Sequence, residues 1–319
     1  MRYLSLLLFA FSLSSASAAP RDARTQATYD YLLGIWGKNI IAGQSDLTWR
    51  DDVDMAQRVH DDTGKYPALM GYDFMNYYDA TEADGRHQTE EAIAWSRKGG
   101  LVSFHWHWRM ENGKFYTKET PYAIPSDQNW RKIDDAIDRI AVELKRLQDA
   151  NVPVLWRPLH EASGGWFWWG RPRSDGVEPA TAYIQLWRHM YTRLTQTHGL
   201  HNLIWVWNGQ DPAWYPGDDV VDITGYDIYD KTYSAAYRKA QQHAKPIALT
   251  ETGYIPDPAQ SAAAGEWWLW FMVWNDAAGA AGVTSQDNFW TGEYHNTGAH
   301  KRKVYNDPRV ITLDRLPKF

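Results

Sequence analysis

The sequence predicts an α/β protein built as a single-domain (β/α)8 TIM barrel, and three observations lead to this fold. Eight short apolar runs recur along the 319 residues. Helical patterns separate several of these runs, and no Pro-, Gly- or Ser-rich linker divides the chain. Strands that alternate with helices pair in parallel, and eight such units can close into a barrel.

The predicted strands are apolar on both faces along most of their length. This is typical of a parallel sheet that helices cover outside and side chains fill inside. The eight runs are 39–45, 67–74, 100–108, 152–161, 202–210, 220–229, 246–254 and 271–276. Helices are predicted near 22–37 and at 131–150 and 180–198. In 131–150, isoleucines and leucines recur at helical spacing, which predicts one buried face.

The main structural alternative is an open, doubly wound parallel sheet. Such sheets carry a Gly-rich, phosphate-binding turn directly after their first strand. The chain that follows residues 39–45 has no such turn. The closed barrel is therefore the predicted architecture.

Residues 1–18 have the three-part pattern of a secretory signal peptide. Arg2 provides the positive start, 4–13 the apolar stretch, and Ala16 and Ala18 fit the cleavage site. A membrane anchor would need about 20 unbroken apolar residues, and serines interrupt this run. We expect cleavage after residue 18, a catalytic domain at 19–319, and a secreted or periplasmic protein.

The composition limits the chemistry and the partners. The chain has no Cys, so disulfides, thiolate nucleophiles and cysteine metal sites are excluded. Its net charge is −6 and no basic stripe is present, so nucleic acid is not an expected partner. The 19 Trp and 19 Tyr exceed what packing requires, and aromatic faces can bind the apolar faces of sugar rings. We expect a monomer with a polysaccharide groove, no cofactor, no metal and no membrane partner.

Polar residues gather at the carboxyl ends of the predicted strands, where barrel active sites are built. Strands three, four, six, seven and eight finish FHWHW, WRPLHE, GYDIY, ALTETGY and MVWND. Glu161 and Glu251 would face each other across the mouth. A single Glu at a strand end is often only a cap or an Arg partner. Two opposed carboxyls about 5–5.5 Å apart, however, can cleave a sugar acetal as acid and nucleophile.

Two alternatives come from other functional classes. His105 and His107 have a ligand-like spacing that suggests a metal-dependent barrel hydrolase. That site would need more His or Asp ligands at the same end, and the other strand ends offer mainly Glu, Tyr and Trp. A non-catalytic sugar-binding protein is the second alternative. It would be expected to lack one carboxylate, and this chain has both.

The stretch RPLHEASGGWFWWG at 157–170, with TETGY at 250–254, resembles the glycoside hydrolase family 26 β-mannanases. The resemblance covers essentially the mature chain. It implies a retaining endo-1,4-β-mannanase that cleaves mannan, galactomannan or glucomannan, with Glu161 as acid/base and Glu251 as nucleophile. The same mechanism acting on β-1,3-1,4-glucan or β-1,3-xylan is the alternative within this fold.

The resemblance also implies a set of substrate-binding residues: His107, His160, Trp166, Asp227, Tyr229 and Trp274. Among them, Tyr229 would hold the nucleophile by a hydrogen bond, and Trp274 would be the platform under the attacked sugar. The chain reads His-Glu-Ala-Ser-Gly where the family commonly has His-Glu-Met-Asn-Gly, and Asn275 stands where an Arg often follows the platform. These differences concern the sugar subsites and leave the catalytic pair in place.

The remaining residues of 157–170 have distinct expected roles. Arg157 and His160 would position the acid, and the small residues 162–165 would leave room for the departing sugar. Trp166 would face sugar. Phe167 and one of the two tryptophans after it would instead pack the loop against the barrel.

Overall fold

The computed structural model describes residues 20–48, 53–77, 84–110, 112–126, 130–173, 175–276 and 286–319. The predicted signal peptide and the domain boundary at residue 18 lie outside this range. In the described part of the chain, no helix combines the length and the apolar character needed to cross a membrane.

Eight parallel strands form a closed barrel, as the sequence predicts. They are β1 (Ile40–Ser45), β2 (Leu69–Asp73), β3 (Leu101–His105), β4 (Val154–Arg157), β5 (Leu203–Trp207), β6 (Ile223–Ile228), β7 (Ile247–Thr252) and β8 (Trp270–Val273). Each strand pairs with the next, and β1 pairs with both β8 and β2, which closes the ring. The open-sheet alternative is therefore wrong. Each strand lies within its predicted run except β8, which starts one residue earlier.

A ninth strand, β9 (Val310–Ile311), is absent from the sequence prediction. It pairs in parallel with Ile40 and Ile41 at the start of β1, whereas β2 pairs only from Gly43 onward. β9 thus occupies the edge of β1 that β2 does not reach. Two residues are too few for a hydrophobic pattern to reveal a strand.

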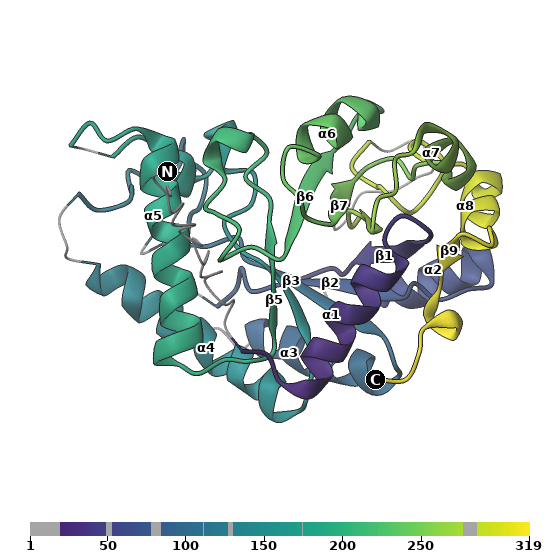
Figure 1. Ribbon diagram of the computed structural model, residues 1–319, viewed down its shortest axis with the longest axis horizontal. Coiled ribbons are helices and arrows are strands. Elements are labelled where there is room, and N and C mark those ends of the chain that lie inside the picture. Colours follow the sequence, from purple (N-terminus) through teal and green to yellow (C-terminus); the bar gives the residue numbers. More distant parts are fainter. Residues whose placement is uncertain are drawn as a thin grey trace, which may run out of the picture.

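The helices surround the strands (Figure 1). They are α1 (Ala23–Ile35), α2 (Met55–Thr63), α3 (Asp84–Arg97), α4 (Arg131–Asp149), α5 (Pro179–Thr192), α6 (Tyr233–Ala240), α7 (Pro258–Ala264) and α8 (Gly298–Tyr305). The three predicted helices correspond to α1, α4 and α5, and a π-helical turn extends α5 to Thr197. α4 buries the predicted face, and α8 packs beside α2 although the two are far apart in sequence (Figure 1).

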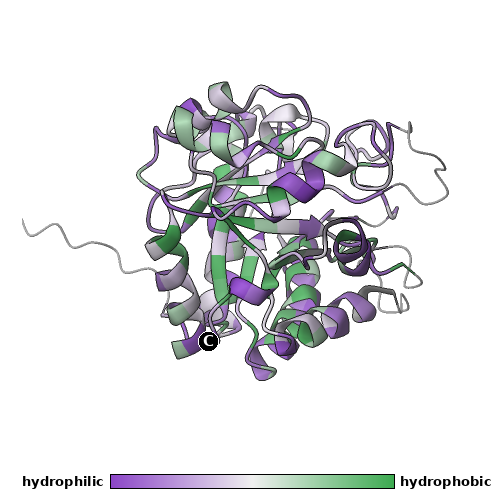
Figure 2. Ribbon diagram, turned by 90° about the vertical axis from the view of Figure 1, so that its right-hand side faces the viewer, coloured by the Kyte–Doolittle hydropathy of each residue, from purple (hydrophilic) through white to green (hydrophobic). Residues whose placement is uncertain are grey.

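One apolar cluster fills the barrel interior. Alternate strand residues such as Ile41, Leu155 and Ile223 belong to it, together with Leu32 of α1. Leu32 therefore covers the end where the strands begin. Figure 2 shows hydrophobic strands in the centre and hydrophilic segments toward the outside. Small residues are needed inside: a Cβ on Gly43 would approach the Phe271 carbonyl oxygen to 2.6 Å.

Candidate active site

The inward-facing row of each strand changes from apolar to polar at the carboxyl end. Side chains alternate between the two faces of a strand, so a residue two or four positions after an interior residue also points inward. This alternation brings the following strand-end residues to one mouth: Asp73, His105, Arg157, Asn208, Asp227 and Trp274. Most of their side chains are buried. The mouth is therefore a compact polar layer above an apolar interior.

Glu161 lies on a sharp turn beyond β4. The strand ends at Arg157, four residues earlier than predicted, because Pro158 has no backbone N–H to continue the ladder. Leu159 and Glu161 both adopt φ 53°, a left-handed conformation that is strained for residues other than Gly. The Glu161 N–H donates to the Asn208 carbonyl oxygen at 2.7 Å, which holds the turn against the chain after β5.

The surroundings of Glu161 favour its protonated form. Burial raises the pKa of Glu161 well above its usual range, and the charges of Asp227 and Glu251 raise it further. The Nε1–H of Trp166 donates to Glu161 Oε2 at 2.8 Å, which opposes part of this rise. Glu161 therefore carries a proton at neutral pH, as a general acid must.

Glu251 has the opposite electrostatic environment. Burial alone would raise its pKa, but the Arg157 guanidinium, His105 and the Tyr229 hydrogen bond lower it overall. Arg157 Nη2 donates to Glu251 Oε1, and the Tyr229 hydroxyl donates to Oε2 at 2.7 Å. Glu251 is thus held as an ionised carboxylate whose two oxygens have fixed directions.

An irregularity in β7 brings Glu251 to the mouth beside Thr250, which already points inward two residues after interior Ala248. Tyr226 pairs with Leu249, whereas the next residue of β6, Asp227, pairs with Glu251, so Thr250 is an extra residue. Such a β-bulge redirects side chains and is common next to active sites. The Thr250 hydroxyl donates to Asp227 Oδ1 at 2.7 Å. Thr250 and Glu251, which are neighbours on β7, therefore both have their side chains at the mouth.

Asp227 anchors the guanidinium. Its side chain is fully buried, and Oδ2 accepts from Arg157 Nη1 at 3.0 Å. Oδ1 accepts from the Asn208 amide at 2.6 Å and from Thr250. Burial and Glu251 raise the pKa of Asp227, and Arg157 offsets part of this rise. Both oxygens of Asp227 bind protein groups, it lines the hollow beside the mouth, and its contact with sugar stays a prediction.

The two glutamates approach closely across the barrel. One carboxylate oxygen each from Glu161, Asp227 and Glu251 lie within 4.8 Å of one another. Retaining glycosidases hold their two carboxyls about 5–5.5 Å apart, whereas inverting enzymes need about 6.5–9.5 Å. The short approach matches a retaining pair. Two neighbouring carboxyls with opposite pKa shifts are also what an acid and a nucleophile require.

Aromatic side chains line the mouth. Trp166 is 47% exposed, and Trp274 is half-buried with its ring centre 5.5 Å from that of His105. Tyr116, which the sequence prediction did not include, stacks on Phe167 with ring centres 5.5 Å apart. The rings of Trp166, Trp274 and Tyr116 therefore offer surface to a ligand, as the composition suggests.

The other aromatics of 157–170 are structural. Phe167, Trp168 and Trp169 are buried, so packing extends to both tryptophans and not only to one. Trp168 Nε1–H donates to the Trp108 carbonyl oxygen at 2.7 Å, and Trp169 Nε1–H donates to that of His160 at 2.8 Å. Trp169 thereby supports the residue that precedes the acid.

Asp73, His105 and His107 form a second buried cluster. Their ligand-type atoms lie within 4.8 Å of one another, so the strand end of β2 supplies the Asp that the metal-site alternative required. Asp73 Oδ2 lies 2.6 Å from His107 Nδ1, and Oδ1 accepts the His107 backbone N–H at 3.0 Å. These are hydrogen-bond contacts that use both carboxylate oxygens. The cluster therefore fits a hydrogen-bond network better than a metal-binding site.

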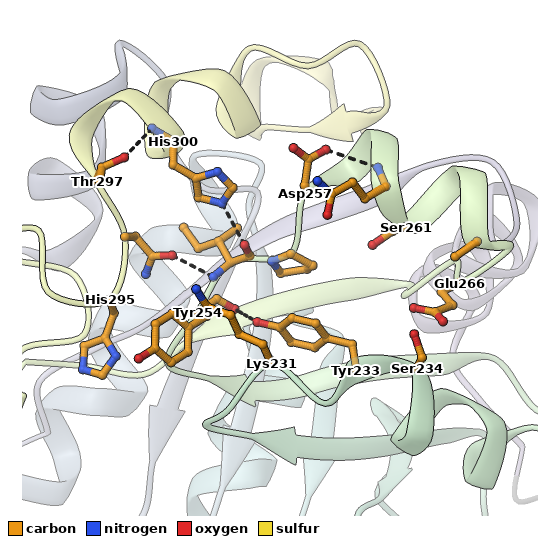
Figure 3. A pocket seen from close by; sticks show the side chains of 15 residues that line it. Lys231, Tyr233, Ser234, Tyr254, Asp257, Ser261, Glu266, His295, Thr297 and His300 are labelled. Atoms are coloured by element: carbon orange, nitrogen blue, oxygen red, sulfur yellow. Dashed lines mark hydrogen bonds between the residues drawn. The ribbon is translucent and has the colours of Figure 1, made fainter.

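Two hollows of about 590 Å³ flank the end of β7. One borders the mouth and includes Ser163, Asp227 and Tyr229 in its lining. The other lies among α6, α7 and α8 (Figure 3). In it, the Tyr233 hydroxyl donates to the Tyr254 carbonyl oxygen and His300 Nε2 donates to that of Ile255 (Figure 3). The walls of this second hollow hold the chain that follows Glu251.

The chain matches a known protein family over nearly its whole length. A family model described as glycosyl hydrolase family 26 matches residues 17–315. The chain belongs to glycosyl hydrolase family 26. The family resemblance seen in 157–170 and 250–254 is therefore confirmed.

The curated relatives that this chain matches are longer than the chain itself. A mannan endo-1,4-beta-mannosidase of Thermothelomyces thermophilus is 41% identical over 96% of this chain and 63% of its own length. Mannan endo-1,4-beta-mannosidase B of Piromyces sp is 34% identical over 91% of this chain and 52% of its own length. The chain thus spans about half to two thirds of these relatives.

Solved beta-mannanase structures share the fold. The GH26-CBM35 beta-(1,4)-mannanase of Podospora anserina superposes with a TM-score of 0.79 and 40% identity, covering 92% of this chain and 67% of that one. A beta-mannanase from a symbiotic protist of the termite Reticulitermes speratus, complexed with gluco-manno-oligosaccharide, gives a TM-score of 0.77 and 29% identity. This match covers 95% of this chain and 97% of the protist enzyme.

Within this family 26 site, the structure places the residues expected to bind sugar at one mouth, with different exposure. Trp166, Tyr229 and Trp274 offer surface, whereas His107 and His160 are 7% and 1% exposed. Arg157 was expected to position the acid, but it contacts Asp227 and Glu251 instead. Asp73, Asn208 and Thr250 were missed. Their signal is a polar residue on the inward row near a strand end.

Asn275 differs from the Arg that is often found in family 26. It is 3% exposed, and its Nδ2 donates to the Asp46 carbonyl oxygen at 2.8 Å. The side chain therefore fixes the loop after β1 and adds no charge to the groove.

Trp274→Ala is expected to weaken catalysis without unfolding the protein. Loss of a half-buried aromatic platform should cost on the order of 1–3 kcal/mol of transition-state binding, or about 5- to 150-fold in kcat/KM. Steady-state kinetics on soluble polysaccharide measure this loss. Tyr31→Ala is the matched control, because Tyr31 packs against Phe319 away from the mouth. Equal kcat/KM in Trp274→Ala and the unmodified protein would remove Trp274 from the sugar site.

Proposed function

We propose that the protein is a retaining endo-1,4-β-mannanase that cleaves internal β-1,4-mannosidic bonds in mannan, galactomannan or glucomannan. One observation carries the proposal: Glu161 and Glu251 approach across the mouth with opposite pKa shifts. Family membership supports glycoside hydrolysis, and the names of the relatives support mannan as substrate.

The first chemical step forms a covalent intermediate. Glu161 donates its proton to the glycosidic oxygen, so the departing sugar leaves as an alcohol. A carboxylate oxygen of Glu251 forms a bond to the anomeric carbon as the bond to the leaving oxygen breaks. Arg157 and Tyr229 direct the Glu251 carboxylate. Trp274 offers its ring to the attacked sugar.

The second step releases the sugar. Glu161, now a carboxylate, takes a proton from water, and the water oxygen displaces Glu251 from the anomeric carbon. Two inversions give net retention of the β-configuration. Proton NMR during the first minutes of hydrolysis should therefore detect the β-anomer before mutarotation. First appearance of the α-anomer would make Glu251 a base and the enzyme inverting.

A product profile tests the substrate. Mannan, galactomannan, glucomannan, barley β-1,3-1,4-glucan and β-1,3-xylan are compared side by side at equal enzyme concentration. We expect oligosaccharides from the three mannans, with an early fall in viscosity that indicates internal cleavage. Faster release from glucan or xylan would replace mannan as the substrate. Hydrolysis that stops in a chelator would favour the metal-dependent alternative.

The two pKa shifts also predict the pH profile. Glu251 must be ionised, and its pKa is lowered, so activity should decline only below the ordinary glutamate pKa of about 4.3. Glu161 must be protonated, and its pKa is raised, so the alkaline limb should lie well above that value. The profile of kcat/KM against pH should therefore be a broad bell that includes neutral pH. Low kcat/KM throughout the range from about pH 4 to 6 would contradict the assignment of Glu161 as acid and Glu251 as nucleophile.

Export is part of the proposal, because a polysaccharide cannot cross a membrane to reach an enzyme inside the cell. Its support is the three-part pattern of residues 1–18. Sequencing the N-terminus of protein recovered from the culture medium or periplasm tests it. A mature chain that begins at residue 19 is expected, and retention of the uncleaved chain in the cytoplasm would contradict export.

A further inference from the structure

We propose that Asp73 is a positioning residue that sets the tautomers of His107 and His160 and, through them, the position of Glu161. This inference rests on the proposed function, because it assigns Asp73 a part in acid catalysis. The three side chains form one chain of contacts from the end of β2 to the residue before the acid.

The first contact fixes the proton on His107. Burial alone would raise the pKa of Asp73, but His105 and His107 hold it well below its usual range. An ionised carboxylate only accepts hydrogen bonds. Asp73 Oδ2 lies 2.6 Å from His107 Nδ1, so this nitrogen must carry a proton. Oδ1 is already used by the His107 backbone N–H at 3.0 Å.

The second contact makes the tautomer of His160 depend on the tautomer of His107. His107 Nε2 and His160 Nε2 lie 3.2 Å apart, and a hydrogen bond between two nitrogens needs one donor and one acceptor. Burial and nearby His107 and Arg157 lower the pKa of His160 well below its usual value, so His160 is neutral. In the imidazole tautomer that carries its proton on Nδ1, Nε2 of His107 accepts, so His160 donates from its own Nε2.

The third step reaches the acid. His160 directly precedes Glu161, and its carbonyl oxygen accepts the Trp169 Nε1–H at 2.8 Å. The Glu161 N–H is bonded to Asn208. His160 is therefore held through its ring and its backbone, next to a left-handed Glu161 whose φ of 53° depends on such support. A changed ring contact would displace the strained turn that carries the acid.

Asp73→Asn exchanges donor and acceptor in the contact between residue 73 and His107 Nδ1. The Asn oxygen must still face the His107 backbone N–H, because a backbone donor cannot lose its proton. The amide nitrogen then faces His107 Nδ1 and forces the His107 proton to Nε2. Two N–H groups would oppose each other between His107 and His160, unless His160 also changes tautomer. Either outcome alters the contact that holds the residue before Glu161.

Two readouts test the proposal on the full-length protein. Long-range ¹H–¹⁵N NMR should find the His107 proton on Nδ1 in the unmodified protein and on Nε2 in Asp73→Asn. The kcat/KM on mannan should fall about 10- to 100-fold, the usual cost of losing a group that orients a catalytic residue. An aryl β-glycoside with a good leaving group needs little protonation, so its kcat/KM should fall less than about threefold.

Asp222→Asn is the matched control. Asp222 is also a buried aspartate that accepts a backbone N–H, that of Trp205 at 2.8 Å, and it pairs with Arg21 at the start of β6. It should lose stability without changing the ratio of the two kcat/KM values. The NMR measurement needs no substrate, so a failure to cleave mannan would overturn the proposed function and leave the tautomer result readable.

Three results would overturn the positioning role. The first is an unprotonated His107 Nδ1 in the unmodified protein, which is decisive even if Asp73→Asn does not fold. The second is an unchanged tautomer in folded Asp73→Asn. The third is an equal fall of kcat/KM on mannan and on the aryl glycoside, which indicates general damage to the site.

Discussion

Glu251→Ala is expected to abolish turnover on every polysaccharide while the protein stays folded. Asp227, the third carboxyl of the described mouth, is not expected to replace the lost nucleophile, because it is buried and bonded to Arg157, Asn208 and Thr250. Removing a nucleophile from a catalytic unit costs on the order of 10⁴- to 10⁶-fold in kcat. Release of reducing sugars from mannan, followed over hours, measures this loss.

The fold should survive this substitution. Arg157 keeps its bond to Asp227, and the lost partners of Arg157 and Tyr229 cost about 1–3 kcal/mol each, against a typical stability of 5–15 kcal/mol. Glu143→Ala is the matched control, because Glu143 is a buried glutamate paired with Arg146 on α4. It should keep full activity. Activity above about one per cent in pure Glu251→Ala would disprove the nucleophile assignment.

Glu161→Ala should discriminate between substrates by their leaving groups. Polysaccharide needs a proton on the departing oxygen, so its kcat/KM should fall about 10²- to 10⁴-fold, the usual contribution of general acid catalysis. Aryl glycosides with good leaving groups need little protonation and should keep most of their kcat/KM. Kinetics on both substrates with the same preparation measure the difference.

The second step of Glu161→Ala provides a further check. Without a base to deprotonate water, the covalent intermediate should accumulate as a burst of released aryl alcohol. Azide needs no deprotonation, so it should restore turnover and give a β-glycosyl azide. Equal losses on polysaccharide and aryl glycoside, with no effect of azide, would mean that Glu161 is not the acid/base.

The barrel is readable from the sequence because its strands are buried on both faces. Runs such as those containing Leu155 and Ile204 are apolar whether a residue points inward or outward, so pattern alone locates them. Their ends are less readable. β4 stops at Arg157 because Pro158 lacks an N–H, and β9 pairs only two residues. Both depend on tertiary pairing that a local pattern does not contain.

The catalytic pair is readable, but its supports are not. Glu161 and Glu251 stand in recognisable stretches, but those stretches do not reveal the extra residue in β7 that turns Glu251 inward beside Thr250. Asn208 and Asp73 are single polar residues near strand ends, and their partners come from other strands. Arg157 lies four residues from Glu161, so proximity in sequence suggested the wrong carboxylate as its partner.

Through its ion pair with Arg157, Glu251 also helps to hold the strands of the barrel together. Among the described strands, β4 pairs with β3 and β5. Its last residue nevertheless reaches Asp227 on β6 and Glu251 on β7 across the barrel mouth. These two ion pairs connect strands that the sheet does not join directly. Protonated Glu251 cannot act as a nucleophile, and its protonation also removes one of the two ion pairs that Arg157 makes across the barrel. Catalytic competence and stiffness of the barrel rim therefore depend on the same proton.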